Sequence, residues 1–154
     1  MHKIKTDSNK KEISEHLLAF NNHVDGFMKD LERIFGDSDT ELILCKGFLS
    51  FRCMKADFVM NGFKKYFLCN KDLCMNILTE NVDYFIETDF MNLVDETDPA
   101  AELTKTLLQK IKGALVKHRD DTSTLKTVFH WMKLLLVSSA SEQGKTLEEI
   151  LSEA

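Results

Sequence analysis

The chain has 154 residues, of which 44% are hydrophobic and 29% are charged, and its formal net charge is -5. These proportions exclude a disordered chain, and the length favours a single domain with a core of its own. The negative net charge argues against nonspecific nucleic-acid binding, which needs a surplus of lysine and arginine on one face. One proline and six glycines leave few helix breakers, so the composition favours helices over many short strands.

The N-terminal segment and the absence of long apolar runs bear on the compartment. Residues 1–10 form a polar, basic arm with no apolar run after it, so we do not expect a secretory signal or secretion. The lysines of this arm either contact a phosphate or an acidic partner, or remain solvated, and the solvated interpretation is favoured. No run reaches the roughly 18 to 20 apolar residues that cross a bilayer, so we expect no membrane span.

The chain contains four cysteines, Cys45, Cys53, Cys69 and Cys74. They lie in or beside apolar runs, as buried reduced thiols do. Four residues separate Cys69 from Cys74, with no second pair and no histidine nearby, so the spacing does not indicate a zinc site. We therefore expect no metal and no cofactor, while one disulfide in an oxidised particle stays an alternative.

Apolar residues recur every three or four positions over residues 13–34 and predict one long amphipathic helix. Ser8 or Asn9 is suited to begin this helix, and Gly36 is suited to end it. So regular a stripe is typical of a coiled-coil seam or of a helix packed in a core, and the other apolar helices favour the core. Gly26 lies inside the helix, where it indicates the close approach of another helix.

The next helix is expected over residues 40–54, after a capping box formed by Ser38 and Glu41. Its apolar residues cover more than one face, which predicts the central and most buried helix of the fold. Another helix is expected to begin at Asp57. The Asn-Gly dipeptide at 61–62 would also suit a hairpin turn, but its flanks do not alternate with period two, so a helix is favoured.

In the second half of the chain, a short helix is expected over residues 73–80. Asp98 followed by Pro99 predicts the start of a long helix, because the acid caps and the proline takes a position that needs no amide donor. A cap at one of residues 121–123 precedes the last large helix. The prediction is an all-α, single-domain bundle of five to seven helices, organised as a basic arm at 1–10, a helical domain at 11–140, and an acidic tail or short helix at 141–154.

Residues 81–93 combine three aromatic side chains with three carboxylates. Asp83 and Glu87 are one helical turn apart, which would let them share a proton or hold a metal. A catalytic pair, however, needs a cleft on which other polar groups converge, and nothing in the sequence marks one. The favoured interpretation is that Asn81 and Asp89 cap short helices and that the aromatic neighbours pack in the core. We therefore do not expect an enzyme.

The stretches FNNHVDGFMKDLERIFGDSDTEL, DYFIETDF and TVFHWMKLLLVSS resemble, in order and spacing, a group of small all-helical proteins of the nucleocytoplasmic large DNA viruses, which infect algae and protists. The likeness spans residues 20–139. The chain departs from that pattern at Gly36, where a proline is expected. The candidate core or contact motif consists of Tyr84, Phe85, Ile86, Asp89, Phe90 and Trp131.

The resemblance implies a viral setting, in the virion or in the host cytoplasm, and carries no catalytic residues. In that setting we expect a non-enzymatic structural or assembly protein, such as a minor capsid or internal virion component, that contacts itself or other viral proteins, because a small helical protein with apolar stripes left for partners suits that role. The alternative is a regulatory adaptor that binds a host or viral protein. The Bcl-2-like groove binders are an analogy of fold class alone, because their NWGR signature is absent. We also expect a homodimer, formed through the first or last helix, because apolar faces are plentiful.

Overall fold

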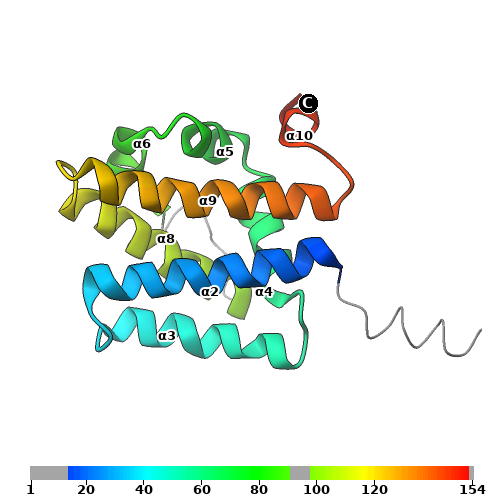
Figure 1. Cartoon of the computed structure of the whole chain (residues 1–154), viewed down its shortest axis with the longest axis horizontal. Coiled ribbons are helices and arrows are strands. Elements are labelled where there is room, and N and C mark those ends of the chain that lie inside the picture. The colour runs from blue at the N-terminus through cyan, green and yellow to red at the C-terminus, as the bar shows by residue number, and fades with distance from the viewer. Residues whose placement is uncertain (1–13, 91–97, 153–154) are drawn as a thin grey trace, which may run out of the picture.

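The structure is a computed structural model that describes residues 14–90 and 98–152 (Figure 1). Over these residues the fold is all-α and contains no strand, as the sequence predicts. The described residues form eight α-helices, close to the five to seven predicted: α2 (Glu15–Phe35), α3 (Thr40–Leu49), α4 (Phe58–Phe63), α5 (Lys71–Leu78), α6 (Val82–Glu87), α8 (Pro99–Lys117), α9 (Thr122–Glu142) and α10 (Leu147–Ser152). A 3₁₀-helix, η1 (Ser50–Cys53), follows α3, and a π-helix, η2 (Lys64–Leu68), continues α4. None of the described helices has both the length and the apolar character needed to cross a membrane.

The two longest helices, α2 and α9, run antiparallel at the centre of the bundle and make its most extensive helix–helix contact (Figure 1). Their ends are tied together, because the Ser14 hydroxyl donates a hydrogen bond to Glu142 at 2.5 Å. Helix α3 lies along the outer side of α2, and α5 and α6 lie beyond α9 (Figure 1). Helix α8 packs against α3, α4, α6 and α9 and so connects the two sides of the bundle.

Helix α2 begins at Glu15, where the Ser14 side chain accepts a hydrogen bond from the Leu17 amide at 3.0 Å. The predicted starts, Ser8 and Asn9, lie outside the described residues. The helix ends at Gly36 as predicted, in a backbone conformation with φ 91° that favours glycine. The predicted stripe is the buried face of α2, and α9 covers it, so this helix is core packing and not a free coiled-coil seam.

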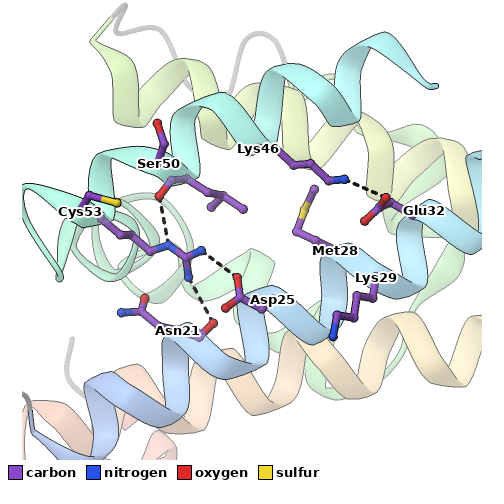
Figure 2. Close-up of a pocket in the computed structure, with 10 residues that line it drawn as sticks. Asn21, Asp25, Met28, Lys29, Glu32, Lys46, Ser50 and Cys53 are labelled. Atoms are coloured by element: carbon purple, nitrogen blue, oxygen red, sulfur yellow. Dashed lines mark hydrogen bonds and ion pairs between the residues drawn. The ribbon is translucent and has the colours of Figure 1, made fainter. Parts of the chain in front are cut away.

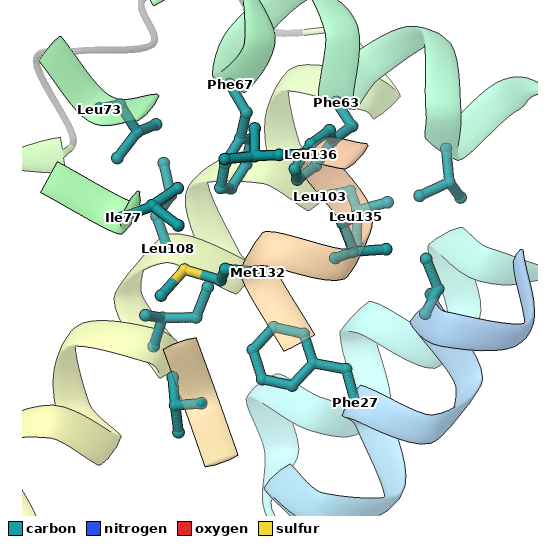
Figure 3. Packing of buried hydrophobic residues seen from close by; sticks show 14 of the residues in the cluster. Phe27, Phe63, Phe67, Leu73, Ile77, Leu103, Leu108, Met132, Leu135 and Leu136 are labelled. Carbon is teal, nitrogen blue, oxygen red and sulfur yellow. The ribbon is translucent and has the colours of Figure 1, made fainter. Parts of the chain in front are cut away.

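The core is one cluster of buried apolar side chains drawn from nearly every helix (Figure 3). Phe20 meets Phe63 edge to face at 5.4 Å between ring centroids, and Phe63 stacks on Phe67 at 4.2 Å. The Asn-Gly dipeptide lies inside α4, so the helix prediction was right there. A Cβ on Gly62 would lie 3.2 Å from the Cβ of Ala100, so glycine lets α4 approach α8 closely.

Local capping signals set most helix starts. Asp98 accepts a hydrogen bond from the Ala101 amide at 2.7 Å to begin α8, and Asp121 caps α9, both as predicted. Asp39, and not the predicted Ser38, caps α3, by accepting from the Leu42 amide at 3.0 Å. The predicted capping box is wrong, because the Glu41 carboxylate bonds to a lysine of α8 and not to the backbone at Ser38.

The C-terminal part of the described chain contains two helices separated by a turn at residues 143–146. Helix α9 continues to Glu142, and α10 follows after Gly144. Thr146 and Glu149 form a reciprocal capping box, in which each side chain accepts a hydrogen bond from the other residue's amide, at 3.1 and 3.0 Å. Ile150 is buried, so α10 is packed against the bundle.

Helix α3 is not the central, most buried helix that the sequence predicts. It lies at an edge of the bundle, buries only Leu42, Cys45 and Leu49, and packs mainly against α8 (Figure 1). The chain also tightens into η1 after Leu49, so the α-helix does not continue to Met54. A helix with apolar residues on several sides therefore leaves one apolar side exposed.

Candidate protein-interaction surface

The aromatic side chains of the predicted motif pack in the core. Phe85 and Phe90 are fully buried, with ring centroids 5.7 Å apart, and Phe85 also meets Phe129 of α9 at 5.6 Å. Tyr84 packs edge-on against both phenylalanines of the motif, at 5.4 and 6.3 Å. Ile86 is half-buried. This part of the motif joins α6 to α9 and offers no binding surface.

The acids of the same motif do not converge on a cleft. Asp83 accepts a hydrogen bond from Arg119 at 2.8 Å, and both side chains are more than half exposed. Glu87 and Asp89 are also exposed. Asn81 caps α6 as predicted, whereas residues 91–93 lie outside the described part of the chain. Within residues 14–90 and 98–152, no group of three or more histidine, cysteine or acidic side chains is placed to hold a metal ion.

Trp131 is not brought together with the other residues of the motif. It lies against α2, where its indole Nε1 donates to Asp30 at 2.6 Å and its ring stacks on Phe27 at 6.5 Å. A Cβ on Gly26 would lie only 2.4 Å from Cη2 of the indole. This confirms that Gly26 marks a close approach of another helix. The residue of α9 that meets the motif is Phe129, two positions earlier.

Two of the four cysteines are buried and two are exposed, and all four are free thiols. Burial raises the pKa of Cys45 to about 12 and that of Cys74 to about 11, so neither forms a reactive thiolate near neutral pH. Cys53 and Cys69 are exposed, against the expectation of buried thiols. Cys53 is at the end of η1, beside the exposed side of α3.

A polar groove of about 650 Å³ separates α2 from α3 (Figure 2). Two ion pairs cross it: Lys46 to Glu32 at 2.8 Å, and Arg52 to Asp25 at 2.7 Å. Arg52 also donates to the backbone carbonyl of Asn21 at 3.3 Å. Because these charged groups bond to one another across the groove, they attach α3 and η1 to α2.

The outward side of α3 and η1 is apolar. Ile43, Leu44, Phe51 and Met54 expose 53%, 51%, 38% and 90% of their surfaces. Ile43 and Leu44 are adjacent on α3, Phe51 lies seven residues after Leu44 in η1, and Met54 directly follows η1. At about 100° to 120° per residue, the four positions fall within roughly a third of a turn, on one side of this helical segment. Gly47 lies in the middle of this side, and a Cβ on it would meet nothing within 4 Å. We call these five residues the α3–η1 face.

A group of exposed apolar side chains such as the α3–η1 face indicates a binding role, whereas scattered surface leucines do not. Single exposed apolar side chains are normal, but several of them gathered on one side of a helical segment are typical of a contact surface. Sequence reasoning missed it, because apolar residues on several sides of a helix also predict burial within the core. The signal that distinguishes the two is Gly47, a residue that is unfavourable within a helix and that lies in the last turn of α3, just before η1 continues the helical segment.

Comparison with protein-family models gave no match, and neither the curated proteins nor the solved structures contain one that matches at a significant level.

Proposed function

We propose that this chain is a non-enzymatic protein that acts through protein–protein contacts made by the α3–η1 face. In the setting that the resemblance implies, it is a structural or assembly component of a virus particle, located in the virion or in the host cytoplasm. The observation that carries the proposal is the exposure of four large apolar side chains on one side of α3 and of the 3₁₀ segment that follows it. Burying one such side chain completely is worth about 1.5 to 3 kcal/mol, so a partner that covers this face gains a substantial free energy.

The face is held in place before any partner binds. Besides the ion pairs to α2, the buried Lys110 of α8 bonds to Asp39 at 2.8 Å and to Glu41 at 3.3 Å, at the start of α3. The same ammonium group lies 3.7 Å from the ring centroid of Phe35. Because α3 is fixed at both ends, little conformational entropy is lost when its outer side is covered.

The adaptor alternative is less well supported by the geometry. A Bcl-2-like adaptor holds a partner helix in an open apolar groove between its own helices. Here the groove between α2 and α3 is crossed by ion pairs. The apolar cavity beside Phe20 and Phe63 has a volume of only about 20 Å³. The exposed apolar side chains of the α3–η1 face suit an assembly contact better than they suit a groove that holds a partner helix.

The test is quantitative mass spectrometry of virus particles purified from the source of the chain, for the wild type and two variants. Met54→Glu places a charge on the α3–η1 face, and Met75→Glu places one on a half-exposed methionine of α5. We expect the wild type and Met75→Glu in the particles at many copies and Met54→Glu to be depleted. Absence of the wild type would contradict the virion role, and full incorporation of Met54→Glu would contradict the role of the face.

A further inference from the structure

Gly47 is a helical glycine whose presence is not explained by any neighbour in the described chain. Glycine in a helix interior costs about 1 kcal/mol relative to alanine. A Cβ at this position would meet nothing within 4 Å, so an alanine would fit. The other described glycines either have positive φ angles or would place a Cβ within 3.6 Å of another residue's side chain: Gly36, Gly144, Gly26, Gly62 and Gly113.

A glycine in the middle of an apolar helix side lets another backbone approach closely, because no side chain separates the two helices. Gly26 and Gly62 have this role inside the fold, toward α9 and α8. Beside Gly47 the described residues leave open space, so the same role there would be toward a helix from outside them. A contact through Gly47 also buries the large apolar side chains before and after it on the same side.

We propose that the α3–η1 face packs against the same face of a second copy of this chain, with the two α3 helices antiparallel and crossing at Gly47. The inference rests on the proposed function, since the face must be a contact surface, and it adds the identity of the partner. It also replaces the expected dimerisation through the first or last helix, because α2 and α9 cover each other's apolar sides.

The charges at the two ends of the face favour the antiparallel arrangement. The exposed Asp37 lies before α3, near Glu41, whose partly exposed carboxylate also bonds to Lys110, and the exposed Lys55 follows η1. An antiparallel pair centred on Gly47 places the acidic end of each copy beside Lys55 of the other. A parallel pair would place the two Lys55 side chains together and the acids together, which is repulsive.

The sizes of the side chains also favour that arrangement. The largest side chains of the face, Phe51 and Met54, lie after Gly47, and the smaller, exposed Thr40 lies at the start of α3, before the other end of the face. In an antiparallel pair, Met54 of one copy lies opposite Thr40 of the other, and Phe51 lies opposite Ile43. Large groups therefore meet smaller ones on both sides of the crossing, as close packing requires.

The first test is the dissociation constant of the full chain, measured by sedimentation equilibrium. We expect the wild type to dimerise, Gly47→Ala to weaken the dimer at least tenfold, and Met54→Glu to be monomeric. Met75→Glu should dimerise like the wild type. The Gly47→Ala variant has a built-in folding control, because its methyl group meets open space in the monomer and should raise the melting temperature of the dissociated chain. A monomeric wild type, or a Gly47→Ala dimer as tight as the wild type, would overturn the inference.

The second test is the orientation of the two helices. Thr40→Cys and Met54→Cys are made separately in a background with Cys53→Ser and Cys69→Ser, which removes the exposed native thiols. A short bifunctional maleimide should link the two variants when they are mixed and should not link either variant to itself. Self-linking of each variant, with none between them, would show a parallel pair and overturn the proposed arrangement.

The two proposals fail in different ways. If the wild type is monomeric but Met54→Glu is still depleted from particles that retain Met75→Glu, the partner is another protein. The proposed function then stands and the second copy is refuted. If Met54→Glu changes neither self-association nor incorporation, both proposals are refuted.

Discussion

Replacing Gly26 with alanine is expected to destabilise the fold, although alanine is the better helix former. In an open helix interior, alanine is favoured over glycine by about 1 kcal/mol. At this position the new Cβ would lie 2.4 Å from Cη2 of Trp131 and 3.0 Å from Cζ2 and Cζ3, so the indole has to move. The direction of the effect depends on how strongly the indole is held.

Several contacts with α2 hold the indole, among them a ring contact with His23 at 6.2 Å between centroids. The indole Nε1 donates to the Asp30 carboxylate at 2.6 Å, and the indole ring stacks on Phe27 at 6.5 Å. Overpacking a well-packed site typically costs about 1 to 3 kcal/mol, and a hydrogen bond to a charged group contributes about 1.5 to 3 kcal/mol if it is lost. Alanine's higher helix propensity offsets part of these costs, so we expect the free energy of unfolding to fall by about 1 to 3 kcal/mol in total. A loss of this size lowers the melting temperature by roughly 2 to 10 °C in a chain of this length.

The assay is urea and thermal unfolding followed by circular dichroism, together with tryptophan fluorescence. Trp131 is the single tryptophan of the chain, so its emission reports directly on a displaced indole. The matched control is Gly113→Ala in α8, where an added Cβ would lie 3.6 Å from the Phe35 ring, an ordinary van der Waals contact. That variant should gain about 0.4 to 1 kcal/mol.

The reasoning would be refuted by equal gains of stability in Gly26→Ala and Gly113→Ala with an unchanged fluorescence spectrum. A double variant tests the proposed cause. In a Trp131→Leu background the clash is largely removed, so Gly26→Ala should no longer destabilise, and the two substitutions should be strongly non-additive.

Three further substitutions test the packing and the charges. Phe85→Ala should lower the free energy of unfolding, measured with urea, by about 3 to 5 kcal/mol, because the ring is fully buried. A loss below about 1 kcal/mol would show that the ring does not belong to the core. Asp83→Asn should change stability by less than about 0.5 kcal/mol, because its ion pair is largely exposed; loss of particle incorporation with folding intact would restore a functional role for this acid. Lys110→Met should cost about 1 to 2 kcal/mol. The Lys110 hydrogen bond lowers the pKa of Asp39, so the difference in free energy of unfolding between the wild type and Lys110→Met should be full above about pH 4 and should shrink as the pH falls further. A difference that does not change with pH would argue against the bond.

The parts of the fold that the sequence predicted correctly are those set by neighbouring residues. Asp98 with Pro99, Asp121 and Asn81 cap the helices that they were expected to cap, because a cap depends on a few consecutive residues. The stripe on α2 was also readable, since it repeats over several turns. Gly26 indicated a close approach of another helix, although the sequence could not identify the indole that makes it.

The parts that could not be predicted depend on contacts between distant residues. Phe129 and Trp131 are two positions apart on α9, and which of them meets the aromatic motif depends on how α9 is placed between α2 and α6. Lys110 is 71 residues from Asp39, and no local pattern joins them. The sequence of α3 does not distinguish the apolar residues that pack against α8 from those that remain exposed, because both kinds are large aliphatic or aromatic side chains on the same helix.

The most direct measurement of contact at the α3–η1 face is the NMR spectrum of the methionine methyl groups over a range of protein concentration. Met54 is 90% exposed on the face, whereas Met75 is 47% exposed on α5, away from it. We expect the Met54 signal to shift as the chain associates, while the Met75 signal stays constant and Gly47→Ala moves the change at Met54 to higher concentration. A Met54 signal that remains unchanged at every concentration, or one that changes only together with Met75, would contradict contact between two copies through this face.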